Sequence, residues 1–94
     1  MTKVQARQLI NGLNLPTPQA NAAMRTIRRA TSSEDIAFQQ THSGELIVTR
    51  TRPGHTGYQV FEDTIAPDGS KDVVQKAFDA AGNLVHDDPK GGTP

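Results

Sequence analysis

The residues best suited to chemistry are concentrated in the segment Thr49–Tyr58, TRTRPGHTGY. Arg50 and Arg52 are two positions apart, which places their side chains on the same face of a strand. A guanidinium group is a rigid fork of donors that fits a phosphate. A histidine such as His55 exchanges a proton near neutral pH, and Tyr58 can stack on a base or donate its hydroxyl to a phosphate.

With Lys76 adding positive charge from a following strand, this set suits cleavage of RNA without a metal ion. That reaction needs a base for the ribose 2′-hydroxyl, stabilisation of the pentavalent phosphate and an acid for the leaving oxygen. The alternative is that arginine and histidine around a Pro-Gly hairpin form an ordinary solvent-exposed turn. Both interpretations stay open on these residues alone.

Other kinds of site have little support in the sequence. The absence of cysteine excludes disulfides, thiolate zinc sites and cysteine nucleophiles. The phosphate-binding, dinucleotide-binding, HExxH and GxSxG motifs are all absent. The three histidines are scattered, and His86 followed by Asp87 and Asp88 is a weak mixed cluster. We therefore expect no metal and no cofactor.

The composition favours one small domain with a thin core. The chain has 94 residues, of which 34% are hydrophobic and 4% aromatic. No stretch approaches about 18 apolar residues, so we expect no membrane partner, and MTKVQARQL lacks the apolar core of a secretion signal.

The net charge of zero conceals an asymmetry. Residues 1–30 contain five bases and no acid, whereas residues 31–94 contain five bases and ten acids. Either the basic segment approaches an anionic partner or it neutralises the acidic remainder of its own chain, and charge counting does not decide between them.

The first third predicts two helices, over residues 3–14 and 18–30. The expected buried stripes are Ala6, Leu9, Ile10 and Leu13, then Ala20, Ala23, Met24 and Ile27. Thr17 is the expected N-cap of the second helix, with Pro18 at its first position.

The rest alternates strand-like runs with turns rich in Gly, Pro, Asp and Asn. Residues 32–35 also fit a capping box for a third short helix, but strand is favoured because a hairpin turn follows. The predicted fold is α+β, with an N-terminal helical hairpin packed on a four- to five-stranded antiparallel β-meander. Residues 1–94 form a single domain, with the hairpin in 1–31, the sheet in 34–88 and a flexible tail in 89–94.

The segment RPGHTGYQVFEDTIAPDGSKDVVQKAFDAAGNLVHDDPKGG, residues 52–92, resembles C-terminal toxin domains of bacterial polymorphic toxins of the Rhs and contact-dependent inhibition types. The similarity lies in the GYQVFE strand, the PDGSK turn, the VVQKAFD strand and the GNLVHDDPKGG close. Helices followed by a meander also resemble the barnase, EndoU, colicin and RelE group of ribonucleases.

This resemblance implies a metal-independent ribonuclease acting on transfer RNA and neutralised by a cognate immunity protein. The implied catalytic residues are His55, Arg50, Arg52, Tyr58 and Lys76, with His86 as a second acid. The domain would be delivered as the tip of a secreted protein, act in the target-cell cytoplasm and be a monomer when free. The acidic later part of the chain departs from the usual basic surface of such nucleases.

Two other functions stay open. One is a non-enzymatic protein-interaction module, either an adaptor or an immunity-like protein. The other is a toxin domain that hydrolyses a nucleotide or NAD.

Overall fold

Two antiparallel helices form the N-terminal part of the protein. The computed structural model describes residues 1–93, with side chains described through residue 87. Helix α1 (Lys3–Gly12) begins with a capping box: the Thr2 hydroxyl accepts from the Gln5 N–H at 3.2 Å, and the Gln5 side chain accepts from the Thr2 N–H at 2.9 Å. Asn14, with a φ of 53°, reverses the chain after α1.

Helix α2 (Thr17–Arg29) starts one residue earlier than expected. Pro16 is the N-cap, and its carbonyl accepts from the Ala20 N–H at 2.9 Å. The prediction of Thr17 as N-cap is therefore wrong by one position, because Pro16 already holds the non-helical backbone that the helix entry requires. Pro18 lies in the first turn, where a backbone N–H is not needed.

The buried faces of the helices differ in part from the expected stripes. Leu9 is 38% exposed, whereas Gln19 and Thr26 of α2 are buried. The Gln19 amide donates to the carbonyls of Gly44 at 2.8 Å and Ile65 at 2.9 Å. A polar residue is favourable here because its buried amide is satisfied by two backbone carbonyls, one in a strand of the sheet and one in a hairpin turn.

The segment before the sheet is a turn, so residues 32–34 form neither the third short helix nor the favoured strand. The Thr31 N–H donates to the Glu34 carboxylate at 2.8 Å, and the Glu34 N–H donates to the Thr31 carbonyl at 3.2 Å. Strand β1 then begins at Asp35.

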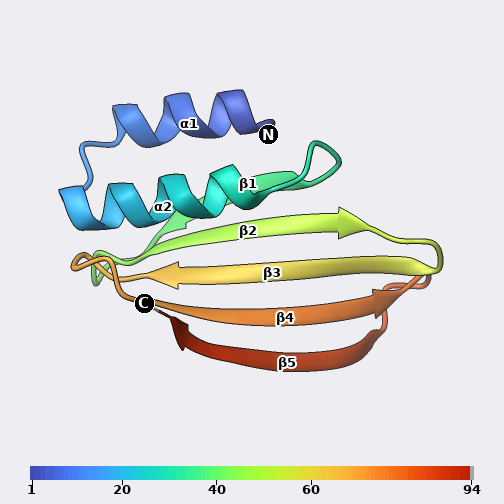
Figure 1. The fold of residues 1–94 in the computed structure, drawn as a ribbon. Helices are drawn as coiled ribbons and strands as arrows, with labels where there is room; N and C mark the ends of the chain where they lie inside the picture. Colours follow the sequence, from blue (N-terminus) through green and yellow to red (C-terminus); the bar gives the residue numbers. More distant parts are fainter. Residues whose placement is uncertain (94) are drawn as a thin grey trace.

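The remaining chain forms one antiparallel sheet in the order β1-β2-β3-β4-β5, which confirms the predicted α+β fold (Figure 1). The strands are β1 (Asp35–Gln40), β2 (Leu46–Pro53), β3 (Gly57–Ile65), β4 (Lys71–Asp79) and β5 (Leu84–Thr93). Successive strands are joined by hairpin turns, as the turn residues predict.

Strand β5 is longer than the sequence indicates. The expected sheet ended at residue 88 with a flexible tail after it, but β5 pairs with β4 as far as Thr93, opposite Lys71. The register shifts between Val73 and Val74, which lie opposite Gly91 and Pro89, so Lys90 is an extra residue there. An edge strand with a bulge accommodates proline. The expected tail is thus wrong for residues 89–93, and residue 94 lies outside the described residues.

The helices cover one face of the sheet, over β1, β2 and β3 (Figure 1). The core between the two layers consists of small and branched residues, namely Ala6, Ile10, Ala22, Ala23, Ile27, Ala30, Ile36, Leu46, Val48 and Ile65. In the described part of the chain, neither helix has the length and apolar character needed to cross a membrane.

Within residues 1–93 no layer covers the opposite side of the sheet (Figure 1). Because neighbouring side chains on a strand alternate between faces, the strand register identifies the residues on this side. We call it the bare face; on its two central strands it carries Tyr58, Val60, Glu62, Val74, Lys76 and Phe78.

Candidate active site

The two arginines of the polar segment bind one buried carboxylate on the helix-facing side of the sheet. Arg50 donates to Glu34 at 3.0 Å and Arg52 donates to its other oxygen at 3.2 Å. The Glu34 side chain is 0% exposed. The prediction that Arg50 and Arg52 share a face is confirmed, and it is the face that also presents Leu46 and Val48 to the helices.

Glu34 is held in its ionised form. Burial raises the pKa of its carboxyl, but hydrogen bonds from Thr31 and the two arginines outweigh burial and lower the pKa below its ordinary value. The Phe61 ring lies 4.8 Å from the Arg50 guanidinium carbon and 5.0 Å from that of Arg52. These two cation–π contacts stabilise both guanidinium groups, although the buried Nε atoms have no hydrogen-bond partner among the described residues. Both arginines therefore already have an anionic partner, the Glu34 carboxylate.

Tyr58 and Lys76 lie on the bare face, separated from the arginines by the sheet. The Tyr58 ring stacks on Phe78 with centroids 4.9 Å apart and planes inclined by 16°. The Lys76 ammonium is 3.7 Å from the Glu62 carboxylate, and the two side chains are 32% and 40% exposed. An aromatic pair, a cation and a carboxylate thus lie on one accessible surface.

His55 lies in the β2–β3 turn beside a hollow that Tyr58 and Phe78 also line. The hollow has a volume of about 530 Å³, and its other lining residues include Gln59, Asp79 and Val85. The His55 side chain is exposed. Of the sequence-predicted residues, the structure therefore brings His55 and Tyr58 to one hollow at the end of the sheet, and Lys76 lies farther along β4 on the bare face.

The carboxylate at the rim of this hollow is part of a turn. Asp79 accepts hydrogen bonds from the N–H groups of Ala81 at 3.0 Å and Asn83 at 2.9 Å. The Asn83 N–H is the largest influence on the pKa of Asp79 and lowers it below the ordinary value. Asp79 thus organises the β4–β5 turn and is a poor candidate for a proton acceptor.

His86 is not part of this arrangement. It lies on β5 opposite Ala77, a position that alternates with Lys76 and Phe78. The strand pairing therefore assigns His86 to the other face of the sheet from Lys76. Asp87 is exposed, and the side chain of Asp88 lies outside the described residues. Within those residues, no group of three potential metal ligands comes together.

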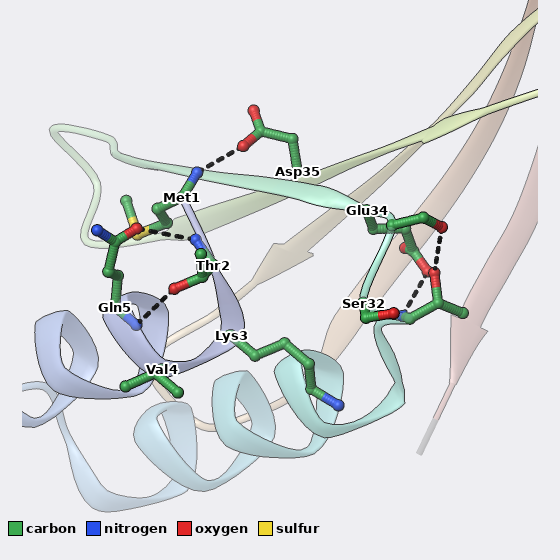
Figure 2. A pocket seen from close by; sticks show the side chains of 10 residues that line it. Met1, Thr2, Lys3, Val4, Gln5, Ser32, Glu34 and Asp35 are labelled. Atoms are coloured by element: carbon green, nitrogen blue, oxygen red, sulfur yellow. Dashed lines mark hydrogen bonds and ion pairs between the residues drawn. The ribbon is translucent and has the colours of Figure 1, made fainter.

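A second hollow, of about 550 Å³, lies between the start of α1 and the turn before β1 (Figure 2). Its lining is rich in hydroxyl groups, contributed by Thr2, Thr31, Ser32 and Ser33. Figure 2 shows Lys3 extending from α1 beside it, and the Lys3 ammonium donates to the Arg28 carbonyl at the end of α2 at 3.0 Å. This hollow contains none of the predicted site residues.

Sequence reasoning missed Glu62, Phe78 and Glu34. Glu62 and Phe78 follow from strand alternation, since Glu62 shares the parity of Tyr58 and Phe78 shares that of Lys76. Their types carried no further signal, because a glutamate and a phenylalanine on alternating strand positions are common on an ordinary sheet surface. Glu34 lies 16 residues before Arg50, and only the β1–β2 pairing brings the two together.

Another missed group is a polar cluster buried between α2 and the sheet. The Thr26 hydroxyl donates to Asp63 at 3.1 Å, and the Lys71 ammonium lies 3.0 Å from both Thr26 and Asp63. Because Thr26 and Asp63 are each at most 2% exposed, this cluster attaches the helix to the sheet and offers no access to a substrate.

Comparison of the chain with protein-family models, with curated proteins and with solved structures finds no match.

Proposed function

We propose that this protein cleaves RNA without a metal ion and that its active site is the bare face together with the hollow beside His55. The observation that carries this proposal is the Glu62–Lys76 ion pair, 3.7 Å long, on the same accessible face as the stacked Tyr58 and Phe78. Acid–base groups and a stacking surface are what a ribonuclease needs when it has no metal.

The residues divide the reaction between them. His55 accepts the proton of the ribose 2′-hydroxyl, whose oxygen then attacks the neighbouring phosphorus, while Glu62 orients Lys76 through their ion pair. Lys76 stabilises the negative charge that develops on the pentavalent phosphate. The bond from phosphorus to the 5′ oxygen breaks, and the imidazolium of His55 returns the proton it accepted to that oxygen. The products are a 2′,3′-cyclic phosphate and a 5′-hydroxyl end.

The roles of Arg50 and Arg52 are revised in this proposal. Both guanidinium groups bind Glu34, on the other side of the sheet from Lys76. We assign them to positioning of β2 and of the turn that carries His55, in place of direct phosphate binding.

The identity of the RNA and the biological setting rest on the resemblance to polymorphic toxin domains. We propose transfer RNA as the substrate, a cognate immunity protein as the inhibitor and the cytoplasm of a competing bacterium as the place of action. The protein would arrive there as the tip of a secreted bacterial protein.

The test is incubation of the purified protein with transfer RNA in excess chelator, followed by analysis of the RNA ends. We expect cleavage that leaves 2′,3′-cyclic phosphate or 3′-phosphate ends and spares DNA, which lacks the 2′-hydroxyl. His55→Ala should lower the rate by roughly 10² to 10⁴. His42→Ala is the matched control, because His42 is equally exposed in another hairpin turn.

Three results would reject the proposed mechanism. One is activity that requires Mg²⁺, and another is cleavage of DNA at a similar rate. The third is full activity of a protein in which His55, Glu62 and Lys76 are all replaced, because no proposed acid or base would then be present.

A second candidate function is a non-enzymatic protein-interaction module. It is supported by Leu84 and Val85, which are 52% and 62% exposed at the start of the edge strand β5. Expression in bacteria without an inhibitor separates the two: a ribonuclease should arrest growth, and the His55→Ala variant should relieve that arrest, whereas an interaction module should permit growth in both forms.

A further inference from the structure

We propose that the helical layer carries a second RNA-binding surface, which contacts phosphates on the side of the protein opposite the bare face. We call this surface the basic cluster; it consists of Lys3, Arg7, Arg25, Arg28 and Arg29. The choice of RNA rests on the proposed function, but the surface itself is derived from different residues.

The helical hairpin gathers these residues from two separate segments. Because α1 and α2 are antiparallel, the first turns of α1 lie beside the last turns of α2 (Figure 1). The contact is direct, since the Lys3 ammonium donates to the Arg28 carbonyl at 3.0 Å. The five positive charges therefore lie along the first half of α1 and the second half of α2.

Among the residues whose side chains the structure describes, no carboxylate forms an ion pair with this cluster. All four arginines are exposed, and in the described residues none of the five cations forms an ion pair. The two acids that follow α2 have other partners: Glu34 binds Arg50 and Arg52, and Asp35 binds the Met1 nitrogen. This favours an external anionic partner over contacts with the acidic part of the same chain.

Helix stability does not account for the whole cluster either. Arg28 and Arg29 lie in the last turn of α2, where positive charge interacts favourably with the helix dipole. Lys3 and Arg7 lie in the first half of α1, where the dipole disfavours a cation, and neither helix contains an acid. An anionic partner would offset the repulsion among these like charges.

Arginine chemistry favours phosphate as that partner. Four of the five cations are arginines, whose donor forks fit phosphate oxygens. The hollow of about 550 Å³ beside Lys3 adds the hydroxyls of Ser32 and Ser33, which can donate to the same oxygens. Its two carboxylates, Glu34 and Asp35, already have cationic partners. A flexible RNA backbone can follow this surface around a protein whose smallest extent is 23 Å.

The helices are poorly suited to a membrane surface. Residues 1–30 contain no aromatic side chain, and the apolar face of α2 is buried against the sheet. An interfacial helix needs an exposed apolar face to enter the bilayer. The apolar residues exposed on the helices are Val4 and Leu9 of α1, at 62% and 38%.

The experiment measures binding of a fluorescent 2′-O-methyl RNA hairpin at several salt concentrations. This probe has no 2′-hydroxyl, so it reports binding without cleavage. The variant R7Q/R25Q removes one charge from each helix at exposed positions outside the last turn of α2. The control Q39E/Q40E changes the net charge equally on exposed positions of β1.

We expect R7Q/R25Q to weaken binding and to reduce the salt slope by about 0.7 to 0.9 for each lost phosphate contact. Q39E/Q40E should leave that slope unchanged. Equal effects of the two variants would show that only net charge matters, and unchanged binding by R7Q/R25Q would remove the cluster from the interface; either result overturns the proposal. So would binding to phosphatidylserine vesicles that depends on Arg7 and Arg25 while RNA binding does not.

These outcomes are separate from the test of catalysis. Loss of cleavage in His55→Ala with intact hairpin binding would bear only on the active site proposed for the bare face and its hollow. It would say nothing about the basic cluster. Normal cleavage of transfer RNA by R7Q/R25Q with unchanged hairpin binding would reject the basic cluster and leave the proposed function standing.

Discussion

The Arg50 guanidinium donates a hydrogen bond to the Glu34 carboxylate at 3.0 Å and thereby joins β2 to the turn that follows the helices. The Glu34 side chain is completely buried, whereas that of Arg50 is 11% exposed. The pair therefore holds Arg50 beneath the helical side of the sheet, away from the bare face.

Replacing Glu34 should destabilise the protein more than replacing an ordinary acid. We expect Glu34→Gln to lower the free energy of unfolding by about 3 kcal/mol, because it leaves two guanidinium groups without their counter-charge. The midpoint of urea unfolding measures this effect. Asp72→Asn is the matched control, since Asp72 is exposed on β4 and forms no ion pair in the described structure. Equal urea midpoints for the two variants would show that the buried Glu34 carboxylate does not contribute to the free energy of unfolding.

The lowered pKa of Glu34 predicts that the folded protein loses stability at acidic pH. Because the pKa of Glu34 is lower in the folded protein than its ordinary value of 4.5, the ionised form stabilises the fold above that value. This contribution should be lost as the pH falls below about 4.5 and through the lowered pKa of the folded state. Urea unfolding at a series of pH values should show a steeper acid loss for the wild-type protein than for Glu34→Gln. If the free energy of unfolding fell in parallel with pH for the two proteins, the acid loss could not be assigned to Glu34.

The junction of β3 and β4 beside His55 requires glycine at position 57. A Cβ atom added to Gly57 would overlap the Phe78 carbonyl oxygen and lie 2.9 Å from backbone atoms of Asp79. We expect Gly57→Ala to cost roughly 1–3 kcal/mol or more, because the ladder must shift to relieve the overlap. Gly12→Ala is the control, since nothing lies within 4 Å of its added Cβ, and its thermal midpoint should hold or rise. A midpoint for Gly57→Ala equal to that of the wild-type protein would contradict this packing.

The fold could be predicted because local signals agreed along the chain. Glycine-containing turns at Gly44, Gly69 and Gly82, each with positive φ, separate runs that alternate with a period of two. The end of β5 was missed because Pro89 and the glycines after it are typical of loops. The free edge of β4 provides backbone partners that a local pattern does not reveal.

The site was predictable only in part, because it depends on which face of the sheet each residue occupies. The even spacing of Arg50 and Arg52 correctly predicted a shared face. Their parity with the apolar Leu46 and Val48 already indicated the helix-facing side. The opposite placement of Tyr58 follows from the pairing of Arg50 with Phe61, a long-range register that no local pattern specifies.

The last prediction concerns the affinity of the stacked pair on the bare face for RNA bases. Tyr58 and Phe78 lie in register on neighbouring strands with their centroids 4.9 Å apart, and both line the hollow beside His55. Tyr58→Ala should weaken binding of the 2′-O-methyl RNA hairpin by about 1–3 kcal/mol, the range for loss of one base–aromatic stack. Tyr58→Phe should bind as the wild-type protein does, because it keeps the ring.

The control for this prediction is Val85→Ala, which alters the same hollow without removing a ring. Fluorescence anisotropy measures all three affinities, with circular dichroism to confirm that each variant is folded. Equal weakening in Tyr58→Phe and Tyr58→Ala would assign the interaction to the hydroxyl, which would donate to a phosphate instead of supporting a stacked base. Wild-type affinity in Tyr58→Ala would place the RNA bases elsewhere on the protein, and the bare face would then lose its role in substrate binding.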